Sequence, residues 1–169
     1  MRRPRRCLVV AAMLVAALAM TACEDTTPDP EVAAAVERTV AAYLGALADS
    51  YSNLDVEPLK EWASPNEVLR VRNLLEGLAR TGDRVDSTLL GYEVDYLEVF
   101  RDINATVRLV EVWDVVRYDA FSGEVKGRTP SSIQRSVLQL RLVDGRWIVI
   151  GRTVLERETP VPESQEEGG

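Results

Sequence analysis

Two hydrophobic periods divide the chain between residues 31 and 156. In the first half, apolar residues recur every three or four positions, which is the spacing of one face of an α-helix. From Thr88 onward, apolar and polar residues alternate, which is the period of a half-buried β-strand. Because the helices precede the strands instead of alternating with them, the pattern predicts an α+β domain with helices packed on an antiparallel sheet.

Three helices are expected in the first half. The longest begins after Asp29, which can cap it, and has Pro30 at its first position. Its apolar stripe consists of Val32, Val36, Val40, Tyr43, Leu44, Leu47 and Tyr51. A short helical turn is expected over residues 57–63. The third helix begins at the capping box Ser64-Pro65-Asn66-Glu67 and ends near Gly82.

Four strands are expected in the second half, at residues 88–99, 104–118, 133–143 and 146–156. The apolar rows of the first two strands slip in phase, which suggests β-bulges that curve the sheet. Residues 119–130 read as a polar loop with Phe121 at its tip. The dipeptide Asp144-Gly145 is typical of a two-residue type I′ hairpin between the last two strands.

The last hairpin carries the motif Val143-Asp144-Gly145-Arg146-Trp147-Ile148-Val149. This motif, after a long, a short and a third helix and a bent meander, resembles the nuclear transport factor 2-like, or cystatin-like, superfamily. The chain is also similar to the small domain at the end of chloroplast-division and related bacterial membrane proteins. The resemblance covers roughly residues 31–156 and implies a cone formed by helices and a curved four-stranded sheet. It implies no single function, because the superfamily includes ketosteroid isomerase, polyketide cyclases and many non-catalytic partner-binding domains.

The first 22 residues have the order of a bacterial secretory signal. Four arginines precede a short apolar run, which is too brief to span a membrane comfortably, and small residues close the segment. Met20-Thr21-Ala22-Cys23 resembles a lipobox, which implies cleavage before Cys23 and lipid attachment to its thiol. We therefore expect a signal peptide (1–22), a lipidated cysteine with a tether (23–30), the α+β domain (31–156) and a disordered acidic tail (157–169).

Charge restricts the partners of the mature chain. The signal peptide holds four arginines and no acidic residue, so its removal changes the formal net charge from −7 to −11. Such a chain is repelled by nucleic acid and by anionic lipid headgroups. Attachment to the extracytoplasmic face of a bacterial cell membrane is therefore expected through the lipid. Arg5-Arg6 also resembles a twin-arginine export motif, although a general secretory signal explains these arginines as well.

Residue types that the chain lacks exclude several kinds of catalysis. There is no histidine, which excludes Ser-His-Asp and Cys-His mechanisms and His-ligated zinc. Of the two cysteines, Cys7 leaves with the signal peptide and Cys23 would carry the lipid. No thiol then remains for a disulfide, a nucleophile or a metal site, and no cofactor is expected.

Glu111 is the main candidate for chemistry, because it interrupts the apolar row of the second strand between Leu109 and Trp113. A carboxyl group in an apolar pocket would be suited to act as a general acid or base. Two non-catalytic alternatives are a pair with Arg108 and a β-bulge between Leu109 and Val112 that would turn Glu111 to solvent, and we adopt the bulge. On that basis Glu111 is expected to be at least partly exposed, and Glu111→Gln to change stability by less than about 1 kcal/mol.

The function expected from the sequence is non-catalytic. The domain would bind another cell-envelope protein through the exposed face or the edge of its sheet. The first alternative is a carrier of a small apolar ligand inside the cone. The second is an isomerase- or cyclase-like enzyme that uses a pocket carboxylate with a tyrosine. The residues expected to line a pocket, if the cone holds one, are Trp62, Tyr92, Tyr96, Glu111 and Trp113.

We predict that lipid on Cys23 holds the protein at the membrane, because several acyl chains bind a bilayer firmly whereas one does so only marginally. Cys23→Ala should move the protein to the soluble fraction or leave its signal peptide uncleaved. Cell fractionation and intact-mass measurement of the wild type and of the variant test this prediction. Processing and membrane retention equal to those of the wild type would show that the lipoprotein interpretation is wrong.

Overall fold

The structure, a computed structural model, describes residues 28–158. The expected signal peptide, Cys23, the tether up to residue 27 and the tail from residue 159 lie outside these residues. Within the described range, no helix is long and apolar enough to cross a membrane. The elements are α2 (Pro30–Asn53), η1 (Glu57–Glu61), α3 (Pro65–Arg80), β1 (Asp83–Phe100), β2 (Asn104–Asp119), β3 (Val125–Val143) and β4 (Arg146–Glu158).

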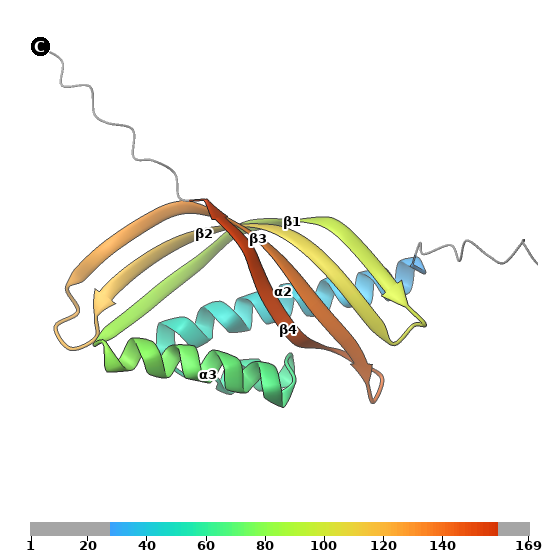
Figure 1. Cartoon of the computed structure of the whole chain (residues 1–169), viewed down its shortest axis with the longest axis horizontal. Helices are drawn as coiled ribbons and strands as arrows, with labels where there is room; N and C mark the ends of the chain where they lie inside the picture. The colour runs from blue at the N-terminus through green and yellow to red at the C-terminus, as the bar shows by residue number, and fades with distance from the viewer. Residues whose placement is uncertain (1–27, 159–169) are drawn as a thin grey trace, which may run out of the picture.

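The four strands form one antiparallel sheet in the order β1-β2-β3-β4, so each strand pairs with the next one along the chain. The sheet is strongly curved, and α2 and α3 lie under its arch (Figure 1). This arrangement confirms the predicted α+β cone, with its helices packed on a curved four-stranded sheet.

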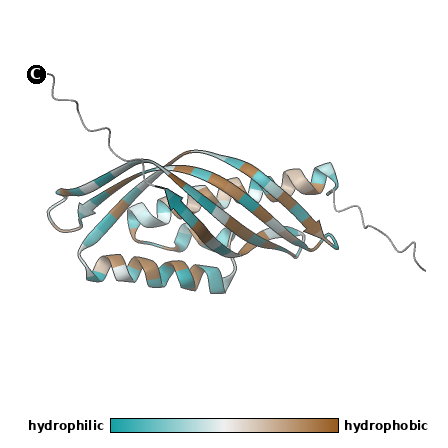
Figure 2. Cartoon of the chain, turned by 45° about the horizontal axis from the view of Figure 1, so that its top comes forward, coloured by the Kyte–Doolittle hydropathy of each residue, from teal (hydrophilic) through white to brown (hydrophobic). Residues whose placement is uncertain are grey.

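The hydrophobic core fills the space between α2, α3 and the concave face of the sheet. Hydrophobic and hydrophilic residues alternate along the strands, as the two-residue period predicts (Figure 2). The predicted stripe of the first helix is the buried one, and its fully buried members are Val36, Val40, Tyr43 and Leu44. From the sheet, the fully or almost fully buried apolar side chains are Val107, Leu109, Leu138, Leu140 and Val149.

Both predicted helix starts are present, but the second uses its residues differently. Asp29 caps α2, with its carboxylate accepting a hydrogen bond from the Glu31 backbone N–H at 2.8 Å. Ser64 caps α3 by accepting from the Glu67 N–H at 3.3 Å. The Ser64 N–H donates to the Val149 carbonyl instead of the Glu67 carboxylate. The reciprocal half of the capping box is therefore not formed, and the Glu67 side chain turns into the core.

Two bulges lie in β1, where the first phase slip was predicted, and further register shifts occur between β2 and β3 and between β3 and β4. The register of β1 against β2 shifts at two points, so that Leu90 and Asp95 are extra residues in β1. The bulge predicted between Leu109 and Val112 of β2 is wrong, because β2 pairs without interruption over these residues with both neighbours. Glu111 consequently keeps its place on the concave face.

The strands are longer than predicted at the end of the sheet farthest from the start of α2. β1 begins at Asp83 and β3 at Val125, so the predicted polar loop shrinks to residues 120–124. Lys126 joins the strands there, with its ammonium 2.9 Å from an Asp83 oxygen and 3.0 Å from an Asp119 oxygen. These residues show no apolar alternation because this end of the sheet extends beyond the core into solvent.

The hairpin predicted at Asp144-Gly145 is confirmed. Val143 pairs with Arg146, and the two residues between them have φ values of +50° and +77°. Both positions are therefore in the left-handed region, as a type I′ turn requires.

We predict that Gly145→Val lowers the free energy of unfolding by about 1–3 kcal/mol, because valine is strained at positive φ. A Cβ atom at this position would meet no neighbouring atom within 4 Å, so a loss is expected to come mainly from the backbone. Gly127→Val is the matched control, because Gly127 also has open space around it but no positive φ. Thermal or urea unfolding that affects both variants equally would contradict the prediction.

Candidate functional site

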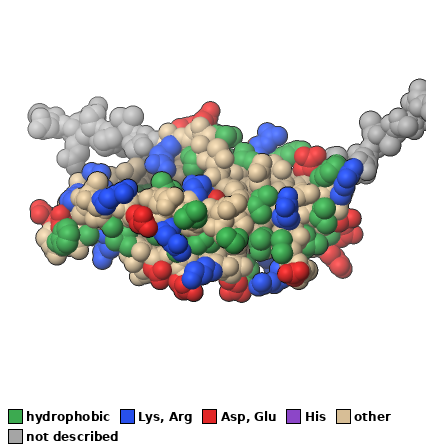
Figure 3. Space-filling model, turned by 60° about the horizontal axis from the view of Figure 1, so that its bottom comes forward, with side chains coloured by type: hydrophobic (Ala, Val, Ile, Leu, Met, Phe, Trp, Pro, Cys, Tyr) green, Lys and Arg blue, Asp and Glu red, His purple; other side chains and the backbone are tan. Residues whose placement is uncertain are grey.

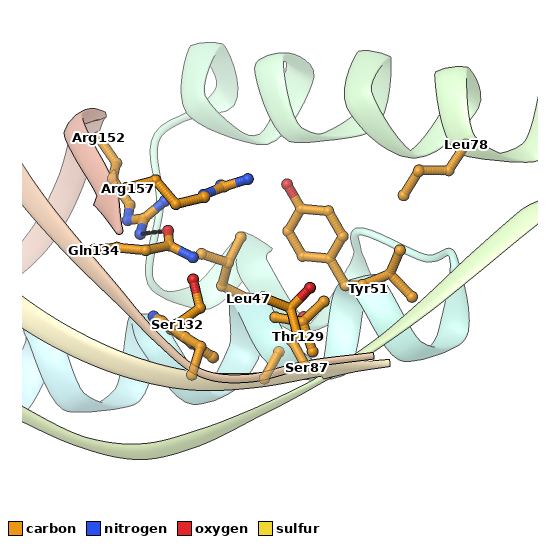
Figure 4. A pocket seen from close by; sticks show the side chains of 13 residues that line it. Leu47, Tyr51, Leu78, Ser87, Thr129, Ser132, Gln134, Arg152 and Arg157 are labelled. Atoms are coloured by element: carbon orange, nitrogen blue, oxygen red, sulfur yellow. Dashed lines mark hydrogen bonds between the residues drawn. The ribbon is translucent and has the colours of Figure 1, made fainter. Parts of the chain in front are cut away.

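A cavity of about 360 Å³ lies at the end of the cone where α2 and α3 finish. This volume is near the lower end of the roughly 300–1,000 Å³ typical of small-molecule sites. Its apolar lining consists of Leu47, Ala48, Leu78, Val85, Trp113 and Val115. Its polar lining consists of Tyr51, Ser87, Thr129, Ser132, Gln134, Arg152 and Arg157. The Tyr51 hydroxyl and the Arg157 guanidinium point toward one another across the cavity (Figure 4).

The charge of the lining is opposite to that of the chain. The chain has 27 acidic and 20 basic residues, and acidic and basic side chains are mixed on the outer surface in view in Figure 3. The cavity is lined by two arginines and, within residues 28–158, by no carboxylate. An anion would therefore be favoured inside it over a cation.

Arg152 is held in place by a buried carboxylate. Its Nη2 donates to Glu111 Oε2 at 2.6 Å and lies 3.4 Å from Gln134 Oε1. The Arg152 side chain is only 10% exposed, and that of Glu111 is 0% exposed. Glu111 is absent from the cavity lining, so it anchors Arg152 from the protein side.

The expectation that Glu111 is partly exposed is therefore wrong. An ionised carboxylate can be buried where its charge is paired and its oxygens accept hydrogen bonds. Besides Arg152, the Trp113 indole N–H donates to Oε2 at 2.7 Å and the Ser136 hydroxyl donates to Oε1. Trp113 is two residues further along the same face of β2, and Ser136 comes from the adjacent strand β3.

A second buried carboxylate, Glu67, lies outside this cavity. It accepts hydrogen bonds from the Tyr43 hydroxyl at 2.6 Å and from Arg70 Nε at 2.8 Å. Burial, together with the neighbouring Glu67 carboxylate, raises the pKa of the Tyr43 phenol well above its usual value. Glu67 and Arg70 line a shallower cavity of about 320 Å³, which Arg152 also borders.

The structure brings together two of the five residues predicted to line a pocket. Trp113 lines the cavity, and Glu111 lies directly behind it. Tyr92 packs against the core opposite Glu111 without lining the cavity. Tyr96 is exposed on the outer face, and its hydroxyl donates to Glu98. Trp62 is half-buried beside η1, where its carbonyl accepts a hydrogen bond from the backbone of β4.

The polar residues of the cavity were missed, although the sequence holds a signal for them. The apolar row that includes Leu138 continues toward the start of β3 as Ser136, Gln134 and Ser132. All three lie on the concave face and are buried. A core-facing row that turns polar predicts a cavity or a buried network at that end of the sheet.

The residues that line the larger cavity are better suited to bind an anion than to transfer a proton. Both oxygens of Glu111 already accept hydrogen bonds, and the cavity lining offers no other carboxylate among the described residues. The buried carboxylate in contact with a tyrosine, Glu67, faces the other cavity. No group of three potential metal-ligating side chains occurs within residues 28–158.

No protein-family model matches the sequence, and no curated protein matches it. Solved structures match in fold. The intermembrane space region of the chloroplast protein ARC6 has a TM-score of 0.59 at 18% identity, covering 76% of this chain and 97% of that chain. A ketosteroid isomerase-like protein from Erwinia carotovora atroseptica has a TM-score of 0.53 at 14% identity, covering 76% and 99%.

An NTF2-like superfamily protein from Salmonella enterica serovar Typhimurium has a TM-score of 0.52 at 12% identity, covering 81% of this chain and 99% of that chain. At such identities the likeness concerns the fold alone. The fold is therefore the NTF2-like, or cystatin-like, α+β cone that the sequence predicted. These neighbours are named for different functions, so none of those functions is assigned to this chain.

We predict that Glu111→Gln lowers the free energy of unfolding by about 3 kcal/mol or more, because it leaves the buried Arg152 charge unpaired. This replaces the smaller effect expected from the sequence. Glu93→Gln, an exposed carboxylate on the outer face of the neighbouring strand, is the matched control and should change stability by less than about 0.5 kcal/mol. Denaturant unfolding of both variants tests this, and equally small changes would contradict it.

Proposed function

We propose that this chain is a non-catalytic binding module whose cavity takes a small molecule with an apolar body and one anionic group. The observation that carries the proposal is the lining, which combines apolar walls with two arginines and no carboxylate among the described residues. A concave, mostly apolar site with a few placed polar groups is the usual form of a small-molecule site. The small apolar ligand, which was the first alternative from the sequence, is thereby replaced by an amphipathic anion.

The two arginines would have different roles. Because the Arg152 charge is paired with Glu111, this side chain offers oriented N–H donors more than net charge. Its Nε is buried and makes no hydrogen bond within residues 28–158. Arg157 is exposed at the rim and would supply the net positive charge.

Binding is favoured over catalysis by the position of the carboxylates. An isomerase-like mechanism needs a carboxyl group that reaches the substrate. Glu111 lies behind Arg152 and is occupied by three donors. Glu67 is fixed by Tyr43 and Arg70, away from the larger cavity.

Attachment to the extracytoplasmic membrane surface through Cys23 and binding of a cell-envelope protein remain part of the proposal. The outer face of the sheet supports the second idea. It presents Tyr96 together with the half-buried Val110, Val112 and Val137, which leaves an apolar centre between charged residues. A protein partner would use this face while the cavity on the opposite face stays accessible.

We predict that the protein binds octanoate more tightly than octanol and does not bind octylamine, which has the opposite charge. Arg157→Met should weaken octanoate binding about tenfold, equivalent to about 1.4 kcal/mol, and leave octanol binding unchanged. Arg135→Met is the matched control, because Arg135 lies on the outer face, where it pairs with Glu156 at 3.4 Å. Calorimetric titration measures the affinities, and the intrinsic fluorescence of the three tryptophans, of which Trp113 lines the cavity, provides a second signal.

Equal affinities for octanoate, octanol and octylamine would contradict an anion site and favour a carrier of purely apolar ligands. Absence of binding by all three probes would contradict the small-molecule function and favour the protein partner.

A further inference from the structure

The tips of two β-hairpins lie together at the end of the domain where α2 begins. These hairpin tips are residues 100–103, between β1 and β2, and residues 143–146, between β3 and β4. Figures 1 and 2 both place them at the same end as the first turn of α2. The Leu142 N–H donates to the Ile103 carbonyl at 2.9 Å, which joins the two hairpins at their tips.

The hairpin tips expose apolar side chains. Phe100 and Ile103 are each 49% exposed, and Val143 is 39% exposed. Exposed apolar groups that cluster on three neighbouring positions, instead of being scattered singly, indicate a contact surface.

Three arginines lie in or beside the hairpin tips. The Arg101 guanidinium stacks on the Phe100 ring at 4.9 Å from its centroid. Arg101, Arg141 and Arg146 take part in no ion pair within residues 28–158. Asp102 and Asp144 lie in the same turns and reduce the net charge. Apolar side chains beside arginines, whose long stems let the guanidinium reach lipid headgroups, are typical of contacts at a membrane interface.

The length of chain before the described residues decides which end can reach a membrane. Four residues lie between Cys23 and Pro28, so the five Cα-to-Cα steps span at most about 18 Å. The far end of the cone, where Phe121 is 90% exposed, lies beyond α2. The 24 residues of α2 alone extend about 36 Å. A lipid on Cys23 would therefore keep the hairpin tips near the bilayer, and an upright domain would hold Phe121 away from it.

We propose that the hairpin tips rest on the phospholipid surface to which Cys23 is anchored, with Phe100, Ile103 and Val143 at the level of the headgroups. This inference rests on the proposed lipid anchor. It adds a second membrane contact, and two contacts fix an orientation that a tether alone leaves open. The cavity is built from the ends of α2 and α3, so it then faces away from the bilayer. Its ligand would enter from the aqueous space and not from the lipid.

The test uses the lipidated mature protein in vesicles of phosphatidylcholine and phosphatidylglycerol. Cys23 is the only cysteine of the mature chain, so lipidation leaves an introduced cysteine as the single free thiol. Ile103→Cys and, as the matched control at the opposite end, Phe121→Cys are labelled with an environment-sensitive fluorophore. A lipid that carries a nitroxide just below its headgroup should quench the label at position 103 at least about threefold more than the label at 121.

Two results would overturn the proposal, and they are distinguishable. If the protein floats with the vesicles but both labels are quenched equally, or position 121 is quenched more, the hairpin tips do not face the bilayer. If the intact mass of the mature protein purified from cells shows no lipid on Cys23, the anchor is wrong and the orientation fails with it. Neither result affects ligand binding by the cavity, which is measured without lipid.

Discussion

The buried ion pair between Glu111 and Arg152 is the interaction on which the site depends. It crosses the sheet from β2 to β4 and passes over β3, whose Ser136 and Gln134 contact the same two charged groups. A buried ion pair gains little over well-packed apolar residues, because removing both charges from water is costly. Its main effect here is positional. It fixes a guanidinium on the concave face. An apolar residue in place of Arg152 would leave the cavity without this charged donor.

The curvature of the sheet determines where this pair can exist. Two extra residues in β1 bend the sheet around α2 without interrupting β2, so the inward row of β2 remains continuous through Glu111. On the neighbouring strand β3 the inward row is apolar toward the hairpin tips, at Leu140 and Leu138, and polar toward the opposite end, at Ser136, Gln134 and Ser132. Where the row is apolar, α2 covers it and the core is filled. Where it turns polar, the helices end and the cavity remains open.

Much of the fold could be predicted from the sequence because its signals are local. The helix caps, the change of period and the turn at Asp144-Gly145 each depend on a few neighbouring residues. The site could not be predicted in the same way, because its partners are far apart along the chain. Glu67 fits a capping box as well as it fits a buried carboxylate, and only the position of Tyr43, 24 residues earlier, decides between them. Glu111 presented the same ambiguity, since its partner Arg152 lies 41 residues later in the chain.

That ambiguity bears on function as well as on structure. A carboxylate within an apolar row invites an enzymatic interpretation, because burial can prepare it to transfer protons. The same burial also allows a carboxylate to hold an arginine in place, and the two roles differ in which group faces the cavity. At the larger cavity Glu111 lies behind and the arginines lie in front, so the surface available to a ligand there donates hydrogen bonds and carries positive charge. An acidic chain with such a lining would repel anions over most of its surface and attract them at this cavity, which is why we propose selective binding and not chemistry.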